Sequence, residues 1–136
     1  MISSRFLINV YPYFVFKADP KRFSLKYAVL FEPNNGVVDP GSGIHYNNML
    51  HAQVDAVRFA ISKAGGDEGL EIRVSETGLP STGDPDEASA TPENARRYIG
   101  NLMRMMAEGK GMPARARDPL RVDIFMLFNE NLKPRP

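Results

Sequence analysis

The sequence alternates between strand-like and helix-like segments in the order strand, helix, strand, helix, strand. The strand-like segments cover residues 6–16, 70–76 and 120–128, and the helices are expected over 45–64 and from Thr91 to the glycines at 109 and 111. Strands that are joined through a helix run parallel, with right-handed connections. The pattern therefore predicts an α/β fold in which the carboxyl ends of all three strands lie at the same end of one sheet.

Both predicted helices have clear ends. Gly65 and the glycine after it stop the first helix. Thr91 can cap the second, Pro92 suits a first helical position, and Glu93 complements the helix dipole. The first helix also has apolar residues at helical spacing, namely Leu50, Val54, Val57 and Ile61. These signals support the two crossovers that a parallel sheet requires.

Glu76 lies where the middle strand runs out into a loop. Leu70, Ile72 and Val74 alternate with polar residues, and Gly78 breaks the strand just beyond. By number parity Glu76 falls on the same face as these apolar residues, where a carboxylate is costly to desolvate unless it is paired or functional. Since α/β enzymes place catalytic groups at the carboxyl ends of parallel strands, Glu76 is a candidate catalytic residue. The alternative is a solvated strand-end glutamate or a cap on the next turn.

The third strand leads into a second carboxylate, Glu130. In a parallel sheet Glu76 and Glu130 are expected at adjacent strand ends. Arg73, Arg121 and Asp123 fall on strand faces that a fully covered parallel sheet would keep apolar. Either these residues lie near the strand starts and reach solvent, or that face of the sheet is incompletely covered.

Composition and charge exclude several classes of function. The chain has 136 residues, with 17 Lys and Arg against 16 Asp and Glu, so its near-neutral charge favours neither nucleic acid nor an anionic membrane as a partner. It has no cysteine, and His45 and His51 lack the spacing of metal ligands, so we expect no metal and no cofactor. No apolar run approaches the roughly 18–20 residues of a membrane helix. The opening residues also lack the pattern of a signal peptide.

Three segments carry more specific motifs: Asn-Val-Tyr-Pro-Tyr-Phe at 9–14, Val-Ser-Glu-Thr-Gly-Leu-Pro-Ser at 74–81, and Phe-Asn-Glu-Asn-Leu-Lys at 128–133. In this order they resemble segments of the plant endo-1,3-β-glucanases, glycoside hydrolase family 17. The middle motif is similar to the family's nucleophile segment, which usually reads Ser-Glu-(Ser/Thr)-Gly-Trp-Pro-Ser, so Leu79 stands where the family has tryptophan. The resemblance covers nearly the whole chain, but only the C-terminal part of the family.

The resemblance implies a role for each candidate site residue. Glu76 matches the nucleophile of a retaining mechanism, and Tyr11 matches a tyrosine that hydrogen-bonds it. Phe14 can stack on a sugar ring, and its alternative is a place in the core. Glu130 and Lys133 resemble an electrostatic and sugar-binding pair close to the nucleophile. The family's acid/base glutamate belongs to the fourth strand of the barrel, which the resemblance does not include.

The same resemblance implies that residues 1–136 form one partial family 17 catalytic domain. It would be the C-terminal part of a (β/α)8 TIM barrel, strands six to eight, and incomplete as a barrel. Three parallel strands cannot close, so both edges of the sheet are expected to be open. Residues 17–43 are expected to be a long loop that helps to wall the substrate cleft, with Phe31 as a wall residue or a packing anchor. Residues 113–119 are expected to be a basic, irregular connector.

Three functions remain open at this point. The first is a truncated hydrolase of 1,3-β-glucan that is weak or inactive alone, because general acid catalysis is typically worth 10²–10⁴-fold. The second is a module that binds β-glucan without cleaving it. The third is an assembly partner that associates with itself or another chain through the open sheet edges. Family members are secreted, in the cell wall or in the vacuole, whereas this sequence leaves the compartment open.

Overall fold

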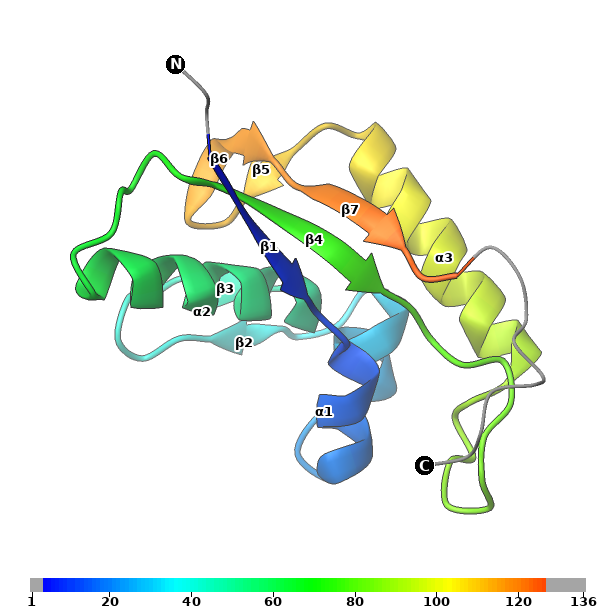
Figure 1. Cartoon of the computed structure of the whole chain (residues 1–136). Coiled ribbons are helices and arrows are strands. Elements are labelled where there is room, and N and C mark those ends of the chain that lie inside the picture. Colours follow the sequence, from blue (N-terminus) through cyan, green and yellow to red (C-terminus); the bar gives the residue numbers. More distant parts are fainter. Residues whose placement is uncertain (1–3, 127–136) are drawn as a thin grey trace.

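The computed structural model describes residues 4–126. Its central sheet contains β1 (Arg5–Asn9), β4 (Glu71–Thr77) and β7 (Arg121–Ile124), in the order β1-β4-β7, and both pairings are parallel (Figure 1). Helix α2 (Met49–Lys63) precedes β4, and α3 (Pro92–Ala107) lies between β4 and β7. The predicted order of strands and helices and the parallel sheet are therefore confirmed.

The first predicted strand is too long. β1 ends at Asn9, and Pro12 opens a short helix, α1 (Pro12–Ala18). Proline has no N–H to donate and its fixed φ suits the first helical turn, so Pro12 begins a helix here instead of ending a strand. The segment that follows is also more regular than expected. It contains a five-residue π-helix, η1 (Lys26–Leu30), which ends at Phe31 in the left-handed conformation.

The long helices differ in how well their starts were predicted. α3 begins as expected, because Thr91 Oγ1 accepts the N–H of Asn94 at 3.1 Å. α2 begins at Met49 and not at His45, since the side chain of Asn48 caps it. The residues before this cap form β3 (His45–Tyr46), which pairs antiparallel with β2 (Val37–Val38).

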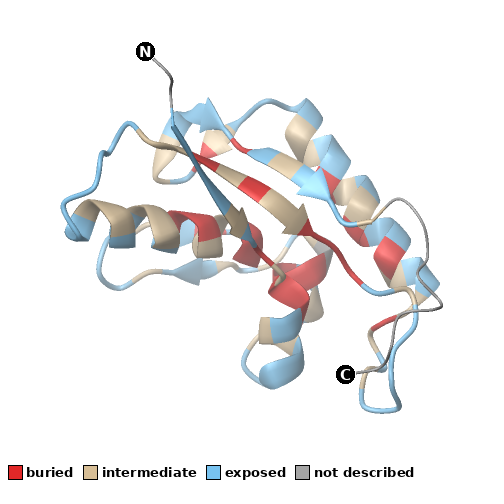
Figure 2. Cartoon of the chain, in the orientation of Figure 1, coloured by how far each residue is buried: buried red, intermediate tan, exposed pale blue. Residues whose placement is uncertain are grey.

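One face of the sheet packs against the helices and forms the core. Ile72 and Val74 of β4 are buried on this side, as their alternation predicts. Figure 2 shows buried residues along β4 and on the helices, whereas β1 and β7 are largely exposed. Burying an aliphatic or aromatic side chain of this size stabilises the fold by about 1.5–3 kcal/mol. The helix residues buried in the same core include Leu50, Val54, Tyr98 and Leu102.

The opposite face of the sheet carries paired charges. Arg73 donates two hydrogen bonds to Asp123, at 3.1 and 2.6 Å, and Arg5 Nε lies 3.0 Å from Glu71. Arg121 approaches the same Glu71 at 3.6 Å. Within residues 4–126 this face is not covered, which decides between the two explanations of the charged residues. Exposed pairs of this kind contribute at most about 1 kcal/mol each, so they make the open face compatible with water and add little stability.

The connector at 113–119 is not irregular. β5 (Gly111–Met112) and β6 (Arg115–Pro119) form an antiparallel hairpin that precedes β7 in the sequence. Asp55 of α2, which is fully buried, accepts the Ala114 N–H at 2.9 Å and so fixes the turn. Since this contact joins residues far apart in sequence, the charged local sequence gave no sign of it. The predicted third strand begins as expected but β7 ends at Ile124, and residues 127–128 lie outside the described part.

Candidate active site

β4 contains one more residue than its neighbours just before it ends. Ile8 of β1 pairs with Val74, but the next residue, Asn9, pairs with Glu76, so Ser75 has no partner of its own. The register with β7 shifts in the same interval of β4. This is a β-bulge, a feature that commonly turns a side chain next to an active site.

The bulge changes the side of the sheet to which Glu76 belongs. Thr77 is fully buried, and its Oγ1 lies 2.5 Å from the hydroxyl of Tyr98 on α3. Thr77 therefore faces the helices, as Val74 does, and Glu76 lies on the opposite, open side. The parity prediction that Glu76 shares a face with Ile72 and Val74 is wrong, because one inserted residue inverts the alternation.

Glu76 accepts a hydrogen bond from Tyr11. The Tyr11 phenol oxygen lies 2.8 Å from Oε2 of Glu76, the contact that the sequence resemblance implies. Tyr11 is positioned between β1 and α1, directly before Pro12. Burial, followed by the hydrogen bond to Glu76 and the charge of Glu76, raises the pKa of Tyr11 to about 12. The phenol therefore remains a hydrogen-bond donor at all ordinary pH values.

Backbone contacts on both sides hold the strand end that carries Glu76. The N–H of Val10 donates to the Glu76 carbonyl at 2.9 Å, and the N–H of Phe125 donates to the Thr77 carbonyl at 2.8 Å. At Gly78 a Cβ atom would come within 2.1 Å of the Phe125 carbonyl oxygen. Only glycine fits there, so the packing of adjacent strand ends requires the glycine that follows Glu76 and Thr77.

Two neighbouring aromatic residues near Glu76 have different environments. Tyr13 is 2% exposed and belongs to the core, whereas Phe14 is 58% exposed. The Phe14 ring lies 5.5 Å from the ring of Tyr11, at 50° to it. Of the two alternatives for Phe14, the structure therefore excludes a buried core position and leaves the ring free to contact a ligand. Its role in sugar binding stays a prediction.

The loop after β4 is joined to α1 by an ion pair. Lys17 Nζ lies 3.0 Å from Glu87 and 3.4 Å from Asp86. The N–H of Asp84, and then Lys17, lower the pKa of the Glu87 carboxyl group. These contacts connect the two segments that flank the Tyr11–Glu76 pair.

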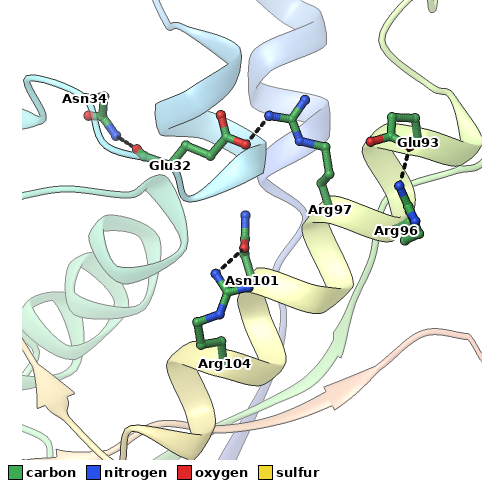
Figure 3. Close-up of polar contacts among 7 residues, drawn as sticks. All are labelled: Glu32, Asn34, Glu93, Arg96, Arg97, Asn101 and Arg104. Atoms are coloured by element: carbon green, nitrogen blue, oxygen red, sulfur yellow. Dashed lines mark hydrogen bonds and ion pairs between the residues drawn. The ribbon is translucent and has the colours of Figure 1, made fainter.

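Leu79 and Phe31 both serve packing. Leu79, which stands at the tryptophan position of the family motif, is 8% exposed and lies in the core. The Phe31 ring is 4.9 Å from that of Tyr98, so Phe31 is an anchor for the long segment. Next to it, Arg97 of α3 binds Glu32, as Figure 3 shows.

Two predicted site residues, Glu130 and Lys133, lie outside the described residues. Among residues 4–126, no group of three or more metal-ligating side chains is found. No helix in that part of the chain is long and apolar enough to cross a membrane.

Sequence reasoning missed Ser75, Thr77 and Tyr98, although the first two flank Glu76 in the motif itself.

Comparison with known proteins adds the family. All 136 residues match the sequence model of the glycosyl hydrolases of family 17. The chain belongs to this family. This family 17 chain is 54% identical to glucan endo-1,3-beta-glucosidase 11 of Arabidopsis thaliana, with 98% of the chain and 32% of the relative covered. A barley protein, putative glucan endo-1,3-beta-glucosidase GVI, is 47% identical over 94% of the chain and 38% of its own length.

Solved structures agree with the family. CJP38, a β-1,3-glucanase and pollen allergen of Cryptomeria japonica, superimposes with a TM-score of 0.86 and 40% identity, covering 97% of this chain and 39% of that protein. A structure from a pair of plant β-glucan endohydrolases with distinct substrate specificities superimposes with a TM-score of 0.82 and 34% identity. This match covers 96% of this chain and 40% of that protein. The family 17 chain thus spans about a third of the length of the curated relatives it matches.

Proposed function

We propose that this family 17 chain contributes the nucleophile, Glu76, to retaining hydrolysis of 1,3-β-glucan. The observation that carries the proposal is the Glu76 carboxylate on the open side of the sheet, at the carboxyl end of the central strand, with Tyr11 bound to one of its oxygens. Enzymes with parallel sheets place their chemistry at this end. Family membership and the names of the relatives support the substrate class.

The chemistry follows from two carboxyl groups. The Glu76 carboxylate attacks the anomeric carbon, and the bond to the leaving oxygen breaks as an acid protonates that oxygen. Water then releases the sugar from Glu76, with the same acid acting as base. Tyr11 binds Oε2, which leaves Oε1 for attack and limits rotation of the carboxylate. The hydrogen bond also stabilises the carboxylate each time it is released.

The second carboxyl group of a retaining enzyme lies about 5–5.5 Å from the first. By the resemblance, it belongs to an earlier strand of a (β/α)8 barrel in which β1, β4 and β7 are strands six to eight. The proton donor would therefore come from a region of the barrel outside the motifs matched here. Phe14, Glu130 and Lys133 are proposed to contact the sugar, and the chain alone is proposed to be weak or inactive as a hydrolase.

Covalent trapping tests the role of Glu76 without requiring turnover. A 2-deoxy-2-fluoro-laminaribiosyl fluoride, which carries its own good leaving group, is incubated with the chain and the adduct is located by mass spectrometry. We expect one glycosyl group on the peptide containing Glu76 and none in Glu76→Gln. Glu71→Gln, the same change at the other end of β4, serves as the matched control and is expected to be labelled. An adduct elsewhere, or labelling of Glu76→Gln, would refute the assignment.

A second candidate is β-glucan binding without cleavage, which the exposed ring of Phe14 next to Tyr11 favours. Laminarin binding measured by calorimetry, alongside release of reducing sugar, separates the two functions. Binding that is lost in Phe14→Ala, with no sugar released and no trapped adduct, would favour the binding module. Sedimentation of the same sample tests self-association through the open edges β1 and β7.

A further inference from the structure

We propose that Tyr98 is a positioning residue for Glu76 and that it acts through Thr77. The proposal rests on the function proposed for Glu76, but it concerns a helix residue that does not touch the carboxylate. Thr77 follows Glu76 directly and points into the core, where its Oγ1 meets the Tyr98 hydroxyl at 2.5 Å. Both side chains are fully buried, so neither can exchange this hydrogen bond for one with bulk water.

The hydrogen bond fixes one side of the bulge. Ser75, on the other side, donates to Oδ1 of Asn9 at 2.8 Å and contacts the carbonyl of Ile8 at 3.2 Å. Glu76 is thus held between two anchored residues, one facing β1 and one facing α3. If the same residues paired in unbroken register, without the bulge, Glu76 would face the helices. The Thr77–Tyr98 contact therefore helps to keep the carboxylate on the side where Tyr11 lies.

Tyr98 is itself held in place from the opposite direction. The Phe31 ring lies 4.9 Å from it, and the adjacent pair of Arg97 and Glu32 joins the same two segments (Figure 3). Burial raises the pKa of the Tyr98 phenol, so it remains a neutral hydrogen-bond partner. The ring thus connects residues 31–32 with the end of β4, and it has little freedom to move away from Thr77.

Carbon NMR of the phenol groups tests the proposal on the chain as it exists. The chain has five tyrosines, so ¹³Cζ-labelled tyrosine gives five signals that single Tyr→Phe variants assign. The Tyr11 signal is expected to shift in Glu76→Gln, because this variant removes the charge that the phenol contacts. In the Tyr98→Phe background we expect the amplitude of this shift to fall by at least about half, because the carboxylate spends less time beside Tyr11. Tyr27→Phe, the same change at a buried tyrosine of η1, should keep the full amplitude.

A second pair of variants separates positioning from simple loss of stability. Thr77→Ser keeps the hydroxyl and Thr77→Val keeps the shape, and both are measured well below their melting temperatures. We expect Thr77→Ser to retain the Tyr11 shift and Thr77→Val to lose it as Tyr98→Phe does. Equal amplitudes in wild type, Tyr98→Phe and Thr77→Val would overturn the proposal.

Fluorosugar labelling gives a kinetic reading. A displacement near 1 Å can cost about 10²-fold in rate, so we expect Tyr98→Phe to label Glu76 about 10–100-fold more slowly at saturating reagent, with its half-saturating concentration nearly unchanged. The two failures remain distinguishable. Absence of labelling in wild type counts against the proposed function, whereas an unchanged Tyr11 signal in Tyr98→Phe counts against positioning. Labelling of Tyr98→Phe at the wild-type rate would also overturn the positioning role of Tyr98.

Discussion

The phenol oxygen of Tyr11 and Oε2 of Glu76 lie 2.8 Å apart, although 65 positions separate the two residues in the sequence. The contact joins the end of β1 to the end of β4. It depends on the parallel register, which brings both ends to the same side of the molecule, and on the bulge, which turns Glu76 toward Tyr11.

Replacing Glu76 by Gln should lower the pKa of Tyr11. The pKa of about 12 has three causes, of which burial is the largest and the hydrogen bond and charge of Glu76 are the others. The variant removes the charge but not the burial, so the pKa should move toward 10 without reaching it. Alkaline titration followed by the Tyr11 ¹³Cζ signal measures this. An unchanged pKa would mean that Tyr11 and Glu76 are not in contact in solution.

Tyr11→Phe should slow labelling of Glu76 by the fluorosugar while leaving the fold intact. A hydrogen bond to a charged group is worth about 1.5–3 kcal/mol, which corresponds to roughly 10–150-fold in rate if it is fully used in the transition state. Circular dichroism and the melting temperature provide the check on folding. Labelling at the wild-type rate would show that the phenol does not assist the carboxylate.

Two glycine substitutions should have opposite effects on stability. In Gly78→Ala the new Cβ would meet the Phe125 carbonyl at 2.1 Å, so the adjacent strand ends must separate, at a cost of about 1–3 kcal/mol. In Gly100→Ala, inside α3, nothing lies within 4 Å of the added atom, and the helix should gain about 0.5–1 kcal/mol. Urea unfolding measures both. The pair fails as a prediction if the two variants shift stability in the same direction.

His51 should make the protein less stable in mild acid. Burial lowers the pKa of His51 to about 4, whereas the unfolded chain binds this proton near its ordinary value of 6.5. The stability that comes from the buried, neutral His51 is fully present above pH 6.5. It is lost as the pH falls toward 4, with a slope in the free energy of unfolding of up to about 1.4 kcal/mol per pH unit.

The test of this slope compares free energies of unfolding across pH 4–7. His51→Gln should remove the contribution of His51, so its difference from wild type should vary with pH. His45→Gln, which leaves His51 in place, is the matched control and should follow the wild-type slope. Parallel curves for wild type and His51→Gln would refute the prediction.

Local sequence signals predicted the parts of the fold that depend on short-range pattern. The cap at Thr91 and the alternation of Ile72 and Val74 were correct because helix capping and strand periodicity involve only a few neighbouring residues. The helix at Pro12 was missed because proline ends strands and begins helices alike. The β5–β6 hairpin was missed because Asp55, on another element, satisfies its turn.

The candidate site was predicted less completely for the same reason. The motifs identified Tyr11 and Glu76, and the structure brings them together. The face to which Glu76 belongs was predicted wrongly, since a bulge is a property of pairing between strands and leaves no mark in the parity of one strand. The contact between Thr77 and Tyr98 also required the position of α3 against β4. The predictions for Glu130 and Lys133 concern residues beyond the described part of the chain.

The extra residue in β4 limits how the length of this chain can vary. Adding one further residue between Ser75 and Glu76 would exchange the outward and inward directions of every side chain that follows in the strand. Such a change would turn Glu76 into the apolar layer and expose Thr77. Residues in the loop beyond Gly78 are not subject to this parity. Natural insertions should therefore accumulate in that loop and be absent from residues 74–77, which contain the bulge.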